Sequence, residues 1–172
     1  MANSNKSKMI EKHIAGLKAI GNKKVEAGWF ESDRYAGTKG DSIGLPVAMV
    51  ARINEFGATI ERGPRSSIKT KKESGASTIM IPARPFMRGA WAKFRSDRKK
   101  IQTKMAKQMI EKKITADQYL GQIGLLLEGY IAKSIKNGGW QKNADSTVAK
   151  KGFDKPLIDD GTMLKTVTSK VS

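Results

Sequence analysis

The sequence has no cysteine and only one histidine, His13, among its 172 residues. Without cysteine, disulfides, thiolate metal ligands and cysteine nucleophiles are all excluded. No acid and nucleophile are legible around His13, which lies in an expected helix, so a catalytic triad is not indicated. Glycine-rich phosphate-binding loops and histidine or cysteine metal spacings are missing as well.

Acidic residues near the C-terminus are the remaining candidates for chemistry. Asp159 and Asp160, together with Asp154, could bind a metal ion or act as nuclease acids. Helix capping and turn formation explain the adjacent pair better, because aspartate favours both positions. We therefore expect no enzyme activity, no catalytic residue, no metal site and no cofactor.

Acidic residues are also scarce overall. The chain has 16 Asp and Glu against 33 Lys and Arg, a formal net charge of +17. Such a charge attracts polyanions, so nucleic acid is the first expected partner class and a membrane surface a lesser one. No stretch resembles a signal peptide, and none approaches the ~18 apolar residues of a membrane span. We expect a protein that is made in the cytoplasm and has no membrane partner.

Hydrophobic residues make up 38% of the chain, which allows one modest core. Apolar spacings of three and four predict helices, and alternation predicts strands. The expected fold is α+β, a single domain over residues 1–172 with one small, mostly antiparallel sheet packed by long helices on one face. Its expected parts are an N-terminal helix at 1–22, a flexible basic loop at 62–77, and a long helical pair at 84–138. The expected strands are residues 23–31, 58–61, 78–81 and 166–171.

A rigid corner is expected between the third strand and the long helix. Ile79 and Ile81 alternate with Met80, as in a short strand. Pro82 and Pro85 then exclude both a continued sheet ladder and a helix interior. Because proline is favourable at a helix start, the helix is expected to begin at Pro85 or Phe86, with the Phe86 ring buried.

Upstream of this corner, residues 47–57 read as a short helix that begins after Pro46 and ends at Gly57. Three segments of the chain then follow in a recognisable order: Ile-Asn-Glu-Phe-Gly at 53–57, Ile-Pro-Ala-Arg-Pro-Phe at 81–86, and Pro-Leu-Ile-Asp-Asp-Gly-Thr-Met at 156–163. Their order and spacing resemble the head–tail connection proteins of tailed bacteriophages, also called tail-completion, neck or virion-morphogenesis proteins. One departure is Asp160, which stands where that family commonly has threonine.

This resemblance implies a structural protein of the virion, made in the host cytoplasm and placed in the phage neck. It implies a closed homo-oligomeric ring around the DNA path, of about six or twelve subunits, that completes the tail or joins head to tail. The implied partners are the portal or connector protein, a tail-tube or tail-terminator protein, and packaged DNA. The residues implied at subunit or partner interfaces are Asn54, Glu55, Phe56, Gly57, Pro82, Arg84, Pro85 and Phe86.

Basic residues gather in two places. The expected loop at 62–77 carries five of them: Arg62, Arg65, Lys69, Lys71 and Lys72. Along the long helix, residues 86–112, another five are candidate contacts: Arg88, Lys93, Arg95, Lys99 and Lys100. They can face DNA, face an acidic protein neighbour, or form a solvated surface. The alternative function is accordingly a sequence-independent nucleic-acid-binding protein.

The second long helix has a clear start. Thr115 and Gln118 form a capping-box pattern, and the helix is expected to end at 137–139. Gly121 and Gly124 lie on one side of it and predict the close approach of another backbone. Its expected apolar face is Tyr119, Ile123, Leu126, Leu127, Tyr130 and Ile131. Shorter helical segments are expected at 146–151 and at 157–166, the latter capped by Asp159 or Asp160.

Overall fold

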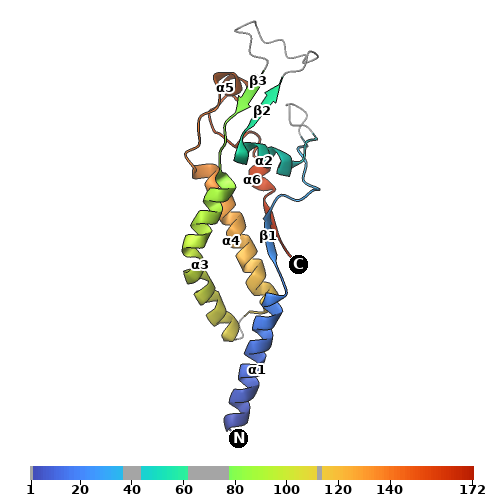
Figure 1. Ribbon diagram of the computed structural model, residues 1–172, viewed down its shortest axis with the longest axis vertical. Helices are drawn as coiled ribbons and strands as arrows, with labels where there is room; N and C mark the ends of the chain where they lie inside the picture. Colours follow the sequence, from blue (N-terminus) through green and yellow to red (C-terminus); the bar gives the residue numbers. More distant parts are fainter. Residues whose placement is uncertain (1, 37–43, 62–77, 112–113) are drawn as a thin grey trace.

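The computed structural model describes residues 2–36, 44–61, 78–111 and 114–172. The molecule is elongated: the N-terminal helix projects from one end and a β-hairpin from the other (Figure 1). The six helices described are α1 (Ala2–Gly21), α2 (Val47–Phe56), α3 (Phe86–Ile110), α4 (Ala116–Asn137), α5 (Asp145–Lys151) and α6 (Thr162–Lys165). The four strands described are β1 (Val25–Gly28), β2 (Ala58–Glu61), β3 (Thr78–Ile81) and β4 (Thr168–Val171). The predicted α+β fold is confirmed, while the basic loop predicted at 62–77 lies outside the described residues.

The strands form two separate antiparallel pairs, so the prediction of one sheet is wrong. Strand β1 pairs with β4, with Val25 opposite Val171, and β2 pairs with β3, with Ala58 opposite Ile81. The β2–β3 pair extends beyond α2, away from the core (Figure 1). Its side chains are largely exposed, Met80 at 80%. Alternation in the sequence identifies each strand but does not determine which strands pair.

The core lies where α2, α3, α4 and α6 meet. Its buried cluster is Val47, Ala51, Phe86, Ala90, Ile131, Ile135 and Met163. Helices α3 and α4 pack along each other, and β1 and β4 lie on another side of α4 (Figure 1). One side of α3 faces this core and α4, since Phe94 and Met105 are buried and Ile101 and Met109 are partly buried.

Helix α4 begins with the predicted capping box. The backbone N–H of Gln118 donates to the Thr115 hydroxyl at 3.2 Å, and the Thr115 N–H donates to Gln118 Oε1 at 2.8 Å. The predicted apolar face is partly wrong, because Leu126 is 38% exposed. Ile131 is buried as predicted, but the other buried positions are Leu120, Gly124 and Ile135, on the side of α4 that β1 and β4 approach.

The glycine prediction for α4 is met in part at one of two positions, where the atoms that approach closely belong to side chains. A Cβ atom at Gly124 would lie 2.4 Å from Ser169 Oγ, because β4 crosses the helix there. A Cβ atom at Gly121 would meet no atom within 4 Å. Of these two glycines, Gly124 alone is the point at which β4 packs tightly against α4.

The C-terminal region is less helical than expected. The helix predicted at 157–166 forms only over Thr162–Lys165. Leu157 and Gly161 both have left-handed backbones, with φ of 63° and 80°, which interrupt an α-helix. The short helix predicted at 146–151 is present as α5.

Helix α1 keeps its apolar stripe in solvent. Ile10, Ile14 and Leu17 are 57%, 46% and 59% exposed. The end of α1 lies beside the start of α4 (Figure 1), and Lys23 in the turn after α1 forms an ion pair with Asp117. None of the helices in the described part of the chain is long and apolar enough to cross a membrane.

Candidate functional site

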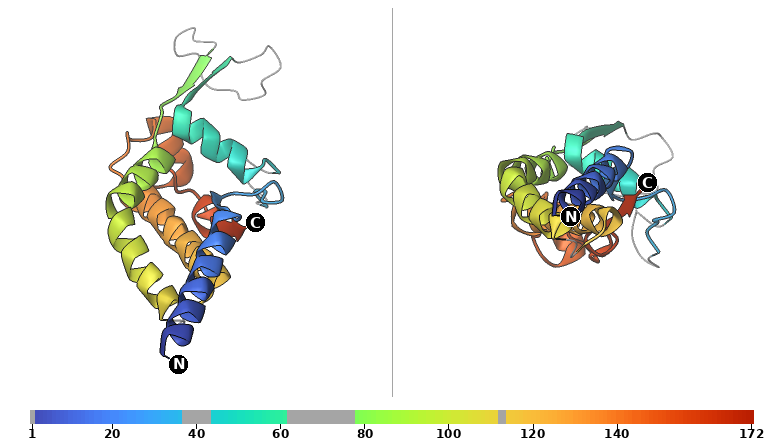
Figure 2. Two further views of the ribbon diagram at one scale, coloured as in Figure 1. Left: turned by 60° about the horizontal axis from the view of Figure 1, so that its bottom comes forward. Right: turned by 90° about the horizontal axis from the view of Figure 1, so that it is seen from below.

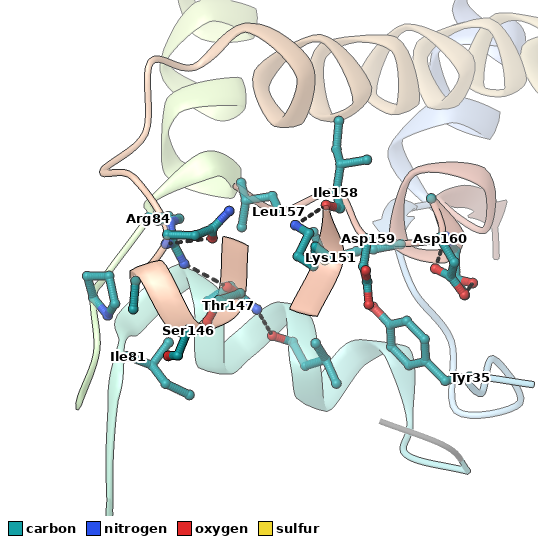
Figure 3. Close-up of a pocket in the computed structure, with 18 of the residues that line it drawn as sticks. Tyr35, Ile81, Arg84, Ser146, Thr147, Lys151, Leu157, Ile158, Asp159 and Asp160 are labelled. Atoms are coloured by element: carbon teal, nitrogen blue, oxygen red, sulfur yellow. Dashed lines mark hydrogen bonds between the residues drawn. The ribbon is translucent and has the colours of Figure 1, made fainter. Parts of the chain in front are cut away.

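The three segments that carry the family resemblance meet in one place, which we call the motif joint. It comprises residues 54–57 at the end of α2, residues 81–86 at the start of α3, and residues 156–163 leading into α6. These parts come from distant stretches of the chain and share one cavity (Figure 3). The contacts within the joint show how its main residues hold the folded chain together.

Glu55 caps α3 from the neighbouring helix. Its buried carboxylate accepts the backbone N–H of Met87 at 2.7 Å and that of Arg88 at 3.1 Å. These two amides belong to the first turn of α3, where backbone donors lack partners within the helix. The residue before α3 is Pro85, which supplies no capping side chain. A carboxylate at this positive end of the helix dipole is favourable, so Glu55 fixes α2 against α3.

Arg88 completes the ion pair with Glu55. Its Nε donates to Glu55 Oε1 at 2.9 Å, and its Nη2 donates to the Glu55 carbonyl at 3.1 Å. The guanidinium also lies 5.1 Å from the ring centroid of Phe56. Arg88 was a candidate contact to DNA, to an acidic partner or to solvent; in the folded chain its guanidinium bonds the end of α2.

Arg84 is buried and connects three segments. Its backbone N–H donates to the Asn54 carbonyl at 2.7 Å, and its Nη1 donates to Asn54 Oδ1 at 3.3 Å. Its Nε reaches the Gln141 carbonyl at 3.1 Å, and its Nη2 reaches Asn143 Oδ1 at 3.3 Å. Burial lowers the pKa of Arg84, and the carboxylate of Asp154 opposes that change. Arg84 therefore joins α2 and the start of α3 to the connection between α4 and α5.

Gly57 allows the chain to turn from α2 into β2 against the corner. Its φ is 75°, and a Cβ atom there would lie 2.9 Å from the Ile81 carbonyl oxygen and 3.0 Å from the Ala83 nitrogen. Both the backbone conformation and the space exclude a side chain. The close approach brings the first two motif segments together at the base of the β2–β3 pair.

Phe86 anchors the joint to the core. Its side chain is completely buried, as the sequence predicts. Trp29 packs edge-on against the ring at a centroid distance of 5.8 Å, and Trp29 Nε1 donates to the Met163 carbonyl at 2.9 Å. The Phe86 carbonyl accepts a 2.8 Å hydrogen bond from Ser134 Oγ on α4. Through these contacts the third motif segment is held against the second.

The predicted capping by Asp159 or Asp160 is wrong, because the N-cap residue of α6 is Gly161 and no side chain caps the helix. Asp160 lies one residue earlier and makes a turn with Thr162. Its carboxylate accepts the backbone N–H of Thr162 at 2.8 Å and the Thr162 hydroxyl at 2.6 Å, at the start of α6. Burial alone would raise the pKa of Asp160, but the hydrogen bonds from Thr162, together with a backbone hydrogen bond and the charge of Lys165, lower it overall. Asp160 thus bonds the residue two positions on, as aspartate commonly does in turns, and it fixes the chain just before α6.

The cavity beside the joint has a volume of about 350 Å³. Tyr35, Lys151 and Asp159 supply polar groups to its lining (Figure 3). Burial, followed by the charges of Asp160 and Asp159, raises the pKa of Tyr35 to about 12. Lys151 Nζ donates to the carbonyls of Lys155, at 2.8 Å, and of Ile158. Burial lowers the pKa of Lys151, and Asp159 opposes this.

Most of these polar groups already form hydrogen bonds within the chain. Lys151 holds the chain turn before α6, and Asp160 bonds Thr162 in that turn. Within the described ranges, no group of three or more His, Cys, Asp or Glu side chains could hold a metal ion. The arrangement is suited to fixing segments in place, and we derive no reaction from it.

The other basic candidates divide by location. On α3, Lys93 Nζ lies 3.6 Å from Asp97 Oδ2, whereas Arg95, Lys99 and Lys100 are exposed. The five loop candidates lie outside the described residues: Arg62, Arg65, Lys69, Lys71 and Lys72. Among the basic candidates in the described part of the chain, the exposed side chains on α3 are therefore best placed to contact a polyanion.

The structure adds roles that the sequence did not reveal. Trp29, Ser134 and Glu55 hold the joint through contacts with distant segments. Of these three roles, only that of Glu55 could have been predicted from the sequence. Helix α3 follows a proline that has no capping side chain, so an acceptor from another segment could be expected there. An intersubunit role for the eight motif residues stays a prediction; Glu55, Arg84 and Phe86 are buried within the subunit, and Phe56 is 62% exposed.

No protein-family model, no curated protein and no solved structure matches this chain. The resemblance to phage head–tail connection proteins accordingly stays a prediction from the three motif segments.

Proposed function

We propose that this chain is a structural protein of a tailed-phage neck, one subunit of a ring at the head–tail junction around the DNA path. The observation that carries the proposal is the motif joint. The three segments that resemble the family are distant in sequence, yet they pack together through Glu55, Arg84 and Phe86. Because the three motif segments form one connected unit, they support the resemblance to the neck proteins better than three separate, unconnected matches would.

The shape of the subunit supports assembly into a larger structure. Apolar side chains are exposed at both ends: Ile10, Ile14 and Leu17 on α1, and Ile60 and Met80 on the β2–β3 pair. Exposed apolar groups at opposite ends suit heterologous contacts, which close into rings when the rotation between subunits allows it. The motif joint lies between these ends and sets the angle of the hairpin relative to the helices.

The charge supports a position beside DNA or beside an acidic protein. The chain carries +17, and Arg95, Lys99 and Lys100 are exposed along α3. Contacts from such residues to phosphates position a protein on nucleic acid without reading its sequence.

Deletion of the gene in its parent phage tests the proposal. We expect lysates with filled heads and separate tails, seen by electron microscopy, and rescue by the wild-type gene supplied in trans. Complete infectious particles without the gene would overturn the neck assignment. Metal-dependent DNA cleavage by the purified protein, lost on changing Asp159 and Asp160 to asparagine, would instead support an enzyme.

The second candidate function is a free, sequence-independent nucleic-acid-binding protein, favoured by the same charge. It predicts that the purified subunit binds unrelated DNA duplexes equally and that affinity falls steeply with salt. Neutralising Arg95, Lys99 and Lys100 to glutamine should reduce both the affinity and the salt dependence. The neck proposal alone predicts a particle-assembly defect, so the two are distinguished by the deletion phenotype.

A further inference from the structure

Helices α3 and α4 form a groove on the surface of the pair. Two adjoining hollows, of about 530 and 460 Å³, run along the helices and share Leu125 and Leu126 in their lining. The first is also lined by Ala90 and Tyr130, and the second by Ile101 and Met105. Strands β1 and β4 pack elsewhere on α4, so they leave this groove uncovered (Figures 1 and 2).

The floor of the groove is apolar and open to solvent. Leu125 is 64% exposed and Leu126 is 38% exposed. Leucines at successive positions near the middle of a helix pair would normally be covered, because their burial removes apolar surface from water. An amphipathic helix laid along such a groove buries its anchors at positions i, i+3 or i+4, and i+7.

The rim of the groove is cationic. Lys93, Lys104 and Lys133 line it. Asp97 is the one acidic residue among the described lining residues, and it is already paired with Lys93 at 3.6 Å and hydrogen-bonded by Tyr130 at 2.7 Å. The groove thus presents an apolar floor between positive charges, which an acidic ligand with an apolar stripe would complement.

Two other occupants fit less well. A DNA backbone could meet the lysines, but it has no apolar group to cover Leu125. The α1 helix of a second copy has an exposed apolar stripe, but it also carries the exposed lysines Lys8 and Lys18, which the cationic rim repels. We propose that the α3–α4 groove binds an amphipathic helix with acidic flanks from a partner protein. This inference does not depend on the neck assignment.

A peptide selection on the purified full-length protein tests it. The library consists of helical peptides with leucine fixed at i, i+4 and i+7, and with the flanking positions randomised among glutamate, glutamine and lysine. We expect glutamate to be enriched at the flanks of the retained peptides. Enrichment of lysine or glutamine, or no retention of any peptide, would overturn the proposal.

Variants locate the binding. Leu125→Ser should weaken a selected acidic peptide by about tenfold, because an anchor contact is lost. The double variant Lys104→Glu, Lys133→Glu should reverse the preference, so that the lysine-flanked counterpart of the peptide binds better. Met80→Ser and Lys142→Glu are the matched controls away from the groove, and both should leave the affinity unchanged. Equal losses in the control variants would place the binding elsewhere and overturn the proposal.

Two further measurements examine the competing occupants. If a DNA duplex binds and Lys104→Glu weakens it while acidic peptides fail to compete, the groove faces nucleic acid and the proposal is wrong. If sedimentation shows self-association that Leu125→Ser and Ile14→Ser abolish equally, the occupant is α1 of a second copy, and the proposal is again wrong. Competition of the acidic peptide with either ligand, lost in Leu125→Ser, supports it. Because Leu125 is exposed, its substitution should leave the melting temperature of the subunit unchanged.

Discussion

Glu55 Oε2 accepts a 2.7 Å hydrogen bond from the backbone N–H of Met87, so the last turn of α2 caps the first turn of α3. The Glu55 carboxylate caps α3, which Pro85 cannot do because it has no capping side chain. It also fixes the angle between α2 and α3. Glu55, the second-last residue of α2, therefore helps to anchor the start of α3.

Replacement of Glu55 by alanine should destabilise the subunit by about 2 kcal/mol or more, because two helix amides lose a charged acceptor. Glu55→Gln should cost less, since one amide oxygen can still accept a hydrogen bond. Urea unfolding measures the difference. Glu61→Gln on exposed β2 is the control, and a change as large as that of Glu55→Ala there would contradict a specific capping role.

Phe86→Ala should lower the free energy of unfolding by about 3–5 kcal/mol, because the ring is completely buried against Trp29. Phe56 offers a matched control from the same joint, with 62% of its surface exposed. Phe56→Ala should cost about 0.5–1 kcal/mol, the value of its contact with Arg88. Thermal or urea unfolding of both variants checks this, and equal losses would refute the assignment of Phe86 as the anchor.

Gly57→Ala combines a steric and a conformational penalty. The new Cβ would lie 2.9 Å from the Ile81 carbonyl oxygen in a backbone with φ of 75°. Gly139 has a φ of 59°, but a Cβ atom added there would meet no atom within 4 Å, so Gly139→Ala isolates the conformational part. We expect about 1 kcal/mol for Gly139→Ala and clearly more for Gly57→Ala in unfolding experiments. Similar values for the two would show that the corner can relax.

The Tyr130–Asp97 hydrogen bond should make stability depend on pH. The bond lowers the pKa of Asp97, with Lys93 contributing further. Because the folded-state pKa is depressed, the stabilisation is present above the ordinary carboxyl pKa and is lost as pH falls through the lowered value. The difference in melting temperature between wild type and Tyr130→Phe should therefore be largest near neutral pH and shrink in acid. Tyr119→Phe should show no such trend.

Asp97→Asn offers a second check on that coupling. In this background Tyr130→Phe should have an effect that no longer varies with acid pH, because the titrating carboxylate is gone. A persistent pH trend would assign the effect to another group.

Local signals in the sequence predict much of the fold. The capping box at Thr115 and Gln118, the proline corner before Phe86 and the glycine after α2 all specify their elements through nearby residues. Strands β1 and β4 are distant in the sequence and pair beside α4. No local sequence pattern encodes that contact. The rotation of the buried face of α4 follows from the same packing and was missed for that reason.

The joint is predictable only in part. Its three segments can be recognised in the sequence, but the roles of Glu55 and Arg84 depend on distant backbone groups. A sequence pattern marks these residues as unusual without indicating whether they face a partner or the subunit interior. Glu55, Arg84 and Phe86 are buried within the chain, and the interface role of the motif residues stays a prediction.

The way in which Arg84 holds the connection after α4 has a consequence for sequence variation. Its Nε and Nη2 reach the carbonyl oxygens of Gln141 and Lys142, at 3.1 and 3.5 Å, rather than their side chains. Any residue presents the same carbonyl, so both positions can change identity freely while the contact is kept. Insertion or removal of a single residue between Trp140 and Asn143 would shift those oxygens away from the guanidinium. This stretch should therefore tolerate substitution and resist changes in length.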